Sequence, residues 1–328
     1  MRRIVIDASL KNLAERFSTD IFSNRYKKPL TKLSEFESFL KTEKFDREAL
    51  YIGNIIKCYL DLLKLLPSQM LDYKKMFDDI IPEAELAKKI VYEDKRKKFY
   101  EHIVDIMRYD ALREKDFFPY LNALGIKSCV YCNAQLTIVV EESGPEAKAL
   151  LELDHYHPKS KCPYLCTSIF NLYPTCGNCN RAKSDDYVSF QLYLEEEVEN
   201  DLELDYFHFK LREEKIVNFL LNRNLEDIDI QLKAISADKE RVVDEMNTKF
   251  HLQKIYDTQK DIVQELIYAK EVYTDSRRQE LVENFKQLFP NREAIDRFIV
   301  GTYVSPSDIH KRPLCKFRQD IARYLKLL

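Results

Sequence analysis

Two pairs of cysteines frame a stretch of residues that could carry out metal and acid–base chemistry. Cys129 and Cys132 form the first pair, and Cys176 and Cys179 form the second, each with two residues between its members. Thiolates at this spacing are typical ligands of structural Zn²⁺, and an ion with four thiolate ligands has no open position for a substrate. The sequence therefore predicts one structural zinc site built by these four side chains.

The segment between the two pairs holds an acid, an imidazole and two amides that the zinc does not need. An imidazole with a pKa near ~6.5 can take a proton from water at neutral pH, which favours His155 as a general base. Carboxylate and amide oxygens suit Mg²⁺ or Mn²⁺, so Asp154 and Asn180 are the expected ligands of a second, catalytic cation. Asn171 is expected to hold the loop through hydrogen bonds from its side chain to the backbone.

The same segment carries a local positive charge. Residues 153–183 contain four basic side chains and one acid, Asp154, although the whole chain has a formal net charge of −3. This net charge argues against a protein that coats nucleic acid through bulk charge, but a local cluster can still contact phosphates. We expect such contacts, without sequence preference, from Lys159, Lys161, Arg181 and Lys183. His157 is expected at the surface or facing phosphate, without a catalytic role.

The residue pattern around the site predicts two strands followed by a helix. The expected order is a strand at 135–142, a strand at 150–155, a loop that contains Pro174, and a short helix at 178–187. This order places Asp154 and His155 at a strand end and Asn180 on the first turn of the helix. A zinc ion would pin the strands to the helix and fix the distance between Asp154 and Asn180. Chelation is therefore expected to unfold the module.

The flanking regions read as mainly helical. Only 5 glycines occur among 328 residues, and Leu, Lys and Glu are abundant. Before the first cysteine pair we expect helices at 52–66, from Pro82 to Val91, and at 114–124. After the second pair we expect strands at 202–206 and 228–232, one long helix or two helices at 242–273, and a terminal helix at 314–327. The predicted fold class is α+β, a mainly helical chain divided into regions 1–124, 125–195 and 196–328.

Composition excludes several classes of protein. No apolar run approaches the ~18 residues of a membrane span, and no signal-peptide pattern is seen, so a cytoplasmic protein without membrane contact is expected. No Gly-rich loop ends in Gly-Lys-Ser/Thr, so the chain is not expected to be an ATPase of that class. The other cysteines are expected to be small buried hydrophobic residues and not part of a disulfide scaffold.

The combined motif resembles a known family of nucleases. The pattern Cys-x-x-Cys, Asp-His-x-x-Pro-Lys-Ser, Asn-Leu, Cys-x-x-Cys-Asn-x-x-Lys is similar to that of the HNH endonucleases, also called ββα-metal or His-Me finger nucleases. The resemblance covers about residues 125–190. More closely, the chain resembles HNH proteins of prokaryotic anti-phage systems, such as the Septu-type nuclease subunit, which works beside an ATPase, and retron-associated proteins.

The resemblance implies a function, a mechanism and a partner. It implies a central zinc-stapled ββα-metal module that hydrolyses phosphodiester bonds, with DNA as the expected substrate and 5′-phosphate products. His155 would be the general base and Asn171 the middle asparagine of the catalytic motif, while Asp154 and Asn180 would bind Mg²⁺ or Mn²⁺ beside the leaving oxygen. The chain would then be the effector of an anti-phage complex with an ATPase partner subunit.

Two alternatives stay open from the sequence. A zinc-stapled module that binds nucleic acid or protein without catalysis explains the four cysteines equally well, but it does not explain Asp154, His155 and Asn180. A nuclease that is inert alone and active only in a complex would explain the long helical flanks. RNA is the alternative substrate, because no residue of the motif is tied to reading a base or a sugar.

Overall fold

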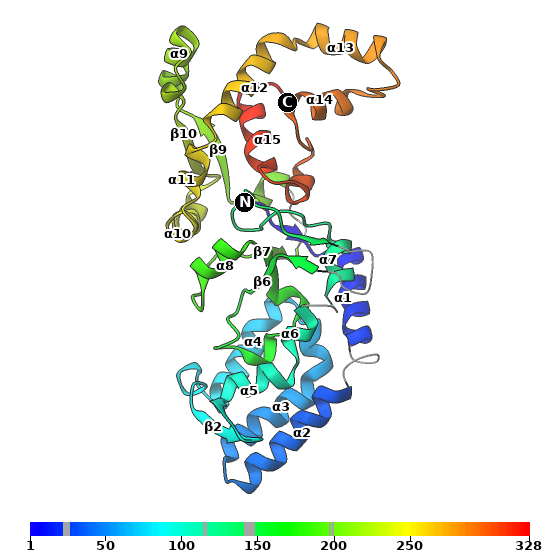
Figure 1. The fold of residues 1–328 in the computed structure, drawn as a ribbon, viewed down its shortest axis with the longest axis vertical. Coiled ribbons are helices and arrows are strands. Elements are labelled where there is room, and N and C mark those ends of the chain that lie inside the picture. The colour runs from blue at the N-terminus through cyan, green and yellow to red at the C-terminus, as the bar shows by residue number, and fades with distance from the viewer. Residues whose placement is uncertain (22–26, 114–116, 141–147, 197, 199) are drawn as a thin grey trace. The chain divides into compact units, whose positions relative to one another are not determined.

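The computed structural model describes residues 1–21, 27–113, 117–140, 148–196, 198 and 200–328. The chain forms two compact units (Figure 1). Unit 1 consists of Met1–Arg2, Gly125–Ile138 and Val198–Leu328, and unit 2 consists of Arg3–Leu124 and Val139–Glu197. Helices dominate and the sheets have two strands each, which confirms a mainly helical α+β fold. None of the described helices is long and apolar enough to cross a membrane.

Unit 2 begins with helices whose apolar faces form its core. They are α1 (Ala8–Asp20), α2 (Lys27–Thr42), α3 (Asp46–Leu63), α4 (Pro67–Ile80), α5 (Phe99–Ile106), α6 (Tyr109–Ala111) and α7 (Phe118–Leu124). Helix α3 buries Ile52, Ile55 and Tyr59 along one face, as the helical spacing predicted. Pro67 lies at the first position of α4, where its missing N–H costs no hydrogen bond.

A hairpin stands where the sequence predicted a helix after Pro82. A short 3₁₀ helix, Glu83–Glu85, leads into β2 (Lys89–Tyr92), which pairs antiparallel with β3 (Lys95–Lys98). The two residues between the strands, Glu93 and Asp94, have φ values of 48° and 57°. Positive φ at both central residues is the signature of a tight hairpin turn, although it usually involves Asn or Gly. The helix prediction was wrong because the acidic turn gave no recognisable signal.

The centre of unit 2 contains one more strand pair than expected. Strand β4 (Ile138–Val140) pairs with β5 (Lys148–Leu150), and residues 141–142, the predicted end of the first strand, lie outside the described residues. Strand β6 (Glu152–His155) pairs antiparallel with β7 (Leu172–Thr175), which the sequence assigned to a loop because of Pro174. Each strand of a two-stranded sheet has an unpaired edge, so a proline is tolerated there.

The last elements of unit 2 complete the surroundings of the site. Helix α8 (Gly177–Lys183) follows β7 directly and is shorter than the predicted helix at 178–187. Strand β8 (Tyr193–Leu194) pairs in parallel with β1 (Ile4–Val5). In the loop between β6 and β7, Tyr164 stacks on Phe77 of α4 with ring centroids 3.9 Å apart. The N-terminal helices therefore support the loop that joins the two strands.

Unit 1 is a small sheet covered by helices. Its elements are β9 (Phe207–Leu211), α9 (Glu213–Asn222), β10 (Ile230–Ala234), α10 (Glu240–Phe250), α11 (Leu252–Asp257), α12 (Lys260–Val272), α13 (Asp275–Asn284), α14 (Arg292–Val300) and α15 (Cys315–Tyr324). Strands β9 and β10 pair antiparallel, and Phe209 of β9 packs edge-on against Phe317 of α15 at 5.1 Å. The terminal helix is confirmed at slightly narrower bounds than 314–327.

Two predictions for unit 1 were wrong in detail. The strand expected at 202–206 is a 3₁₀ helix, Asp201–Leu204, because the Asn200 side chain accepts a hydrogen bond from the Leu202 N–H and starts a turn. The long helical stretch at 242–273 is divided among α10, α11 and α12. His251, with φ 53°, takes a left-handed conformation between the first two of these helices and so separates them.

Candidate functional site

The four paired cysteines form a cluster that can hold a metal ion such as zinc. The Sγ atoms of Cys129, Cys132, Cys176 and Cys179 all lie within 4.8 Å of one another, and all four side chains are buried. Zn–S bonds of about 2.3 Å in a tetrahedron place sulfurs about 3.8 Å apart, so the spacing fits a four-thiolate site. This chemistry matches the predicted structural zinc.

A buried asparagine shapes the first cysteine pair. Asn133 has φ 53° and its N–H donates to the Cys129 carbonyl at 2.8 Å, which closes the turn between the two cysteines. Its Nδ2 donates to Ser128 Oγ at 2.6 Å and to the Ile309 carbonyl at 2.9 Å, while its Oδ1 accepts from the Lys316 N–H at 2.9 Å. Asn tolerates the left-handed conformation well. Asn133 was not among the residues predicted for the site, although its place directly after Cys132 was a signal.

The second cysteine pair is placed by the start of α8. Cys176 is the residue before the first turn and its carbonyl accepts a hydrogen bond from the Asn180 N–H at 3.0 Å. Cys179 lies three residues later, close to one helical turn, so both thiols lie on the same side of the helix start. Asn180 follows on the same turn, as predicted.

Four of the predicted site residues line one pocket in unit 2. The pocket has a volume of about 210 Å³, and Asp154, His155 and Asn180 contribute to its wall. Lys159, predicted to contact phosphate, lines it as well. The remaining lining residues are Tyr109, Arg113, Glu152, Leu153, Pro158, Ser184 and Asp185. A carboxylate, an imidazole and an amide therefore share one small cavity.

The electrostatics of His155 follow from its burial. The side chain is only 6% exposed and its ring lies against Tyr109, with ring centroids 4.6 Å apart. Burial lowers the pKa of His155 to about 3, and the ammonium groups of Lys159 and Lys183 lower it further, against the opposing effect of a hydrogen bond to Cys166. His155 is therefore neutral at pH 7.

The hydrogen bond of His155 selects its tautomer. Nε2 lies 3.0 Å from the carbonyl oxygen of Cys166, and a carbonyl can only accept, so Nε2 carries the proton. In the neutral ring the lone pair then sits on Nδ1. The hydrogen bond to this loop carbonyl therefore leaves Nδ1 as the ring nitrogen of His155 that can accept a proton.

Lys183 does not lie on the surface, contrary to the prediction that it contacts phosphate. Its side chain is fully buried, and Nζ donates to Asp154 Oδ1 at 3.1 Å and to the His155 carbonyl at 2.7 Å. Burial lowers the pKa of Lys183, and the Asp154 carboxylate raises it in opposition. The lysine connects the last turn of α8 to the end of β6, so we assign it to the interior of the site.

Asn171 has a positioning role in the structure, and it is not among the residues that line the pocket. Its side chain is completely buried, and Oδ1 accepts from the His157 N–H at 2.8 Å. Its Nδ2 donates to the carbonyls of His157 and Leu165 at 3.2 and 3.0 Å. These bonds match the expectation that Asn171 holds the loop that follows His155.

The other predicted residues are placed around the pocket without lining it. Lys161 lies over the ring of Tyr187, with Nζ 4.5 Å from the centroid, and the exposed Arg181 donates to Asn178 Oδ1 at 2.6 Å. His157 is only 5% exposed, so the surface position expected for it was wrong. Burial lowers the pKa of His157 to about 4.

Several pocket residues were not found by reading the sequence. Tyr109 and Arg113 belong to the N-terminal region and reach the pocket only through the fold; Tyr109 donates to the Leu153 carbonyl at 2.9 Å. Lys159 Nζ lies 4.8 Å from the centre of the Tyr109 ring. Asp185 follows the cysteine motif by a few residues, and its proximity to Asn180 was the available signal.

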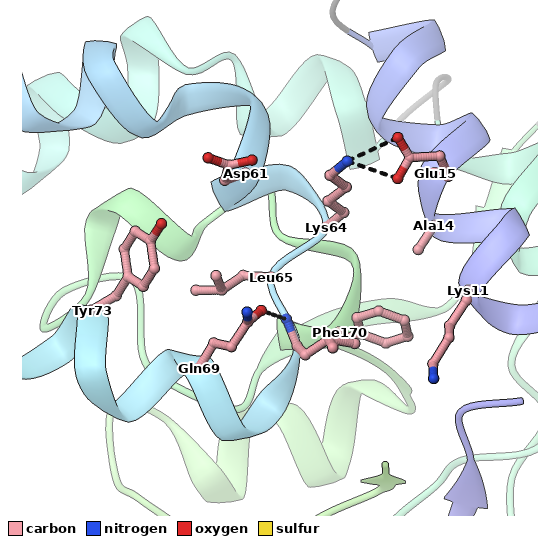
Figure 2. Close-up of a pocket in the computed structure, with 10 residues that line it drawn as sticks. Lys11, Ala14, Glu15, Asp61, Lys64, Leu65, Gln69, Tyr73 and Phe170 are labelled. Carbon is pink, nitrogen blue, oxygen red and sulfur yellow. Dashed lines mark hydrogen bonds and ion pairs between the residues drawn. The ribbon is translucent and has the colours of Figure 1, made fainter.

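A second pocket of unit 2 does not contain the predicted residues. It has a volume of about 380 Å³ and is shown in Figure 2. Lys64 pairs with Glu15 across it at 2.7 Å, and Asp61 and Tyr73 face the same space. One ion pair beside these polar side chains does not indicate a particular chemistry.

Neither a protein-family model, nor a curated protein, nor a solved structure significantly matches this chain. The HNH assignment therefore stays a prediction from the motif.

Proposed function

We propose that this chain is a metal-dependent endonuclease of the HNH type that hydrolyses phosphodiester bonds, with DNA as the expected substrate. The observation that carries the proposal is the pocket shared by Asp154, His155 and Asn180. These groups come from the end of β6 and from α8, and a base and two oxygen donors in one cavity are the set that metal-assisted hydrolysis requires.

His155 is the proposed general base. Its bond to the Cys166 carbonyl leaves Nδ1 to accept a proton from an attacking water. The low pKa of the buried ring keeps it unprotonated at neutral pH, but it also makes the ring a weak base.

Asp154 and Asn180 are the proposed ligands of Mg²⁺ or Mn²⁺. Both line the pocket, and hard carboxylate and amide oxygens are the donors that these cations prefer, so the residues present fit the ion. The bound ion would supply positive charge that stabilises the leaving oxygen. Lys159 lines the same pocket and can pair with a non-bridging phosphate oxygen.

The wider role in an anti-phage complex, with an ATPase as partner subunit, is proposed on the motif resemblance alone. It predicts that the isolated chain has little activity until the partner is added. A co-purification of this chain with the product of an adjacent ATPase gene tests that part separately from the chemistry.

The test of the chemistry is cleavage of plasmid DNA, and of RNA, by zinc-loaded protein with Mg²⁺ or Mn²⁺. His155→Ala should reduce the rate by about 10²–10⁴-fold, the usual contribution of a general base. His251→Ala is the matched control, since His251 is an exposed histidine of unit 1. Zinc content and the melting temperature establish that each variant is folded. Cleavage by His155→Ala at the wild-type rate would refute the assignment.

One observation favours the alternative of a binding module without catalysis. Asp154 is paired with the buried Lys183, and a paired interior carboxylate can be purely structural. Under that alternative the chain binds nucleic acid and leaves it intact with either cation and with the partner present. A mobility-shift assay run beside the cleavage assay separates the two functions.

A further inference from the structure

The buried ion pair of Lys183 and Asp154 lies inside the proposed site. Lysine side chains at the last turn of a helix usually extend into water, whereas Lys183 has no exposed surface. Its Nζ contacts the Asp154 carboxylate at 3.1 Å and the His155 carbonyl at 2.7 Å. A positive charge is thus fixed directly beside the carboxylate that is proposed to bind the cation.

The charges of the pocket lining leave no surplus of buried negative charge. Asp154 is its one buried acid, and Lys183 neutralises it. Glu152 is paired with Arg113 at 3.4 Å, and both are partly exposed. The half-buried Lys159 adds a further positive charge to the lining, and Asp185 is exposed to solvent. His155 is neutral.

Cation affinity depends on this balance. Mg²⁺ and Mn²⁺ are usually bound through one or two carboxylates together with the phosphates of a substrate, and affinity rises with the charge of the ligands. A site with a single neutralised carboxylate binds a divalent ion weakly by itself. A phosphodiester group brings the missing negative charge and a further oxygen donor.

We propose that Lys183 makes binding of the catalytic cation depend on a bound nucleic-acid phosphate. This inference rests on the proposed function of the pocket. Lys183 cancels the charge of Asp154 in the free protein, so the ion and the phosphate enter the site together. Because linkage is reciprocal, the ion also tightens the binding of nucleic acid by the same factor.

The experiment measures Mn²⁺ binding by electron paramagnetic resonance on zinc-loaded, full-length protein. Titrations are run with the protein alone, with a short DNA duplex, and with single-stranded RNA. The His155→Ala background keeps the nucleic acid intact, and Asp154→Asn protein with the same nucleic acid subtracts Mn²⁺ that the phosphates bind by themselves. We expect at least tenfold tighter Mn²⁺ binding when DNA or RNA is present.

Lys183→Met separates the charge from the length of the side chain. Without nucleic acid it should bind Mn²⁺ at least tenfold more tightly than the Lys183 protein, and the effect of nucleic acid should shrink correspondingly. Lys161→Met is the matched control in the arm without nucleic acid, because Lys161 lies over Tyr187 and is not among the residues that line the pocket. It should leave Mn²⁺ affinity unchanged.

Equal Mn²⁺ affinity with and without both nucleic acids overturns the proposal, and so does a folded Lys183→Met protein with unchanged affinity. If Lys183→Met does not fold, equal Mn²⁺ affinity of the Lys183 protein with and without nucleic acid still overturns the proposal, and Lys183→Gln replaces Lys183→Met in the comparison. Failure of the proposed function is a different result. In that case Mn²⁺ binds more tightly with nucleic acid and Lys183→Met reduces the difference, which supports the role of Lys183, while cleavage is absent under every condition.

Discussion

Replacing Asn171 by alanine tests whether this residue acts in the chemistry or in the structure. The side chain makes three hydrogen bonds, to the His157 N–H and to the carbonyls of His157 and Leu165, at 2.8, 3.2 and 3.0 Å. Asn171 is completely buried, so water does not replace these bonds. Alanine therefore leaves one donor and two acceptors without their partner inside unit 2.

The expected cost can be worked out from these contacts. An unsatisfied buried polar group costs roughly 1–3 kcal/mol, and the N–H is the most costly because it has a single hydrogen to donate. The carbonyls keep a second lone pair, so their loss is smaller. Together with the cavity left by the amide, we expect Asn171→Ala to lower the free energy of unfolding by about 3–5 kcal/mol.

Denaturant unfolding compares the unmodified protein and Asn171→Ala at equal zinc content. A cleavage assay follows at a temperature where the variant is folded. Asn178→Ala is the matched control, because Asn178 is exposed and bonded to Arg181. It should change stability by less than about 0.5 kcal/mol. If Asn171→Ala abolished cleavage while stability fell by less than about 1 kcal/mol, Asn171 would have a direct catalytic role and the positioning argument would be refuted.

Three further outcomes are expected. Cys176→Ser should remove the metal, measured as zinc per chain by mass spectrometry, and lower the melting temperature, because four thiolates are needed to close the site. The pKa of His157 is about 4 in the folded chain against ~6.5 in the unfolded chain. Its contribution to stability is therefore fully present above pH ~6.5, and the free energy of unfolding falls by up to about 1.4 kcal/mol per pH unit from there towards pH 4. His157→Gln should flatten this part of the pH profile of stability, which denaturant unfolding measures. Ser184 has φ 52° and ψ −131°, backbone angles that strain any residue with a Cβ. Ser184→Gly should therefore raise the free energy of unfolding by about 1 kcal/mol, and an unchanged denaturation midpoint would contradict this.

The parts of the fold that the sequence predicted are those with a repeating local signal. The apolar face of α3 repeats at helical spacing, and Pro67 marks its boundary. The hairpin of β2 and β3 has no such signal, because an acidic turn at Glu93 and Asp94 replaces the usual glycine or asparagine. Strand β7 was missed because Pro174 argues against a strand in general, but not against a strand with a free edge.

The candidate site was predictable to the extent that its residues are close in sequence. The cysteine spacing predicted the four-thiolate cluster, and the order of strand and helix predicted that Asp154, His155 and Asn180 meet. Tyr109 could not be found in this way, because it is contributed by a separate helix. The burial of Lys183 could not be predicted either, because a basic residue at the end of a helix is usually exposed to solvent.

The position of Lys183 also changes what zinc is expected to do. The sequence suggested that the metal alone fixes the distance between Asp154 and Asn180. In the structure, β6 and α8 are already connected by a buried, charge-assisted hydrogen bond from Lys183 to Asp154 and by a second bond to the His155 carbonyl. Both bonds lie within unit 2 and use no cysteine. We therefore expect chelation to loosen the two cysteine turns first, while the contact between β6 and α8 persists. Hydrogen exchange should then become faster at the amides of Asn133 and Asn180, which close the two turns, and stay slow at the Ser184 amide, which donates to the Asn180 carbonyl at the end of α8.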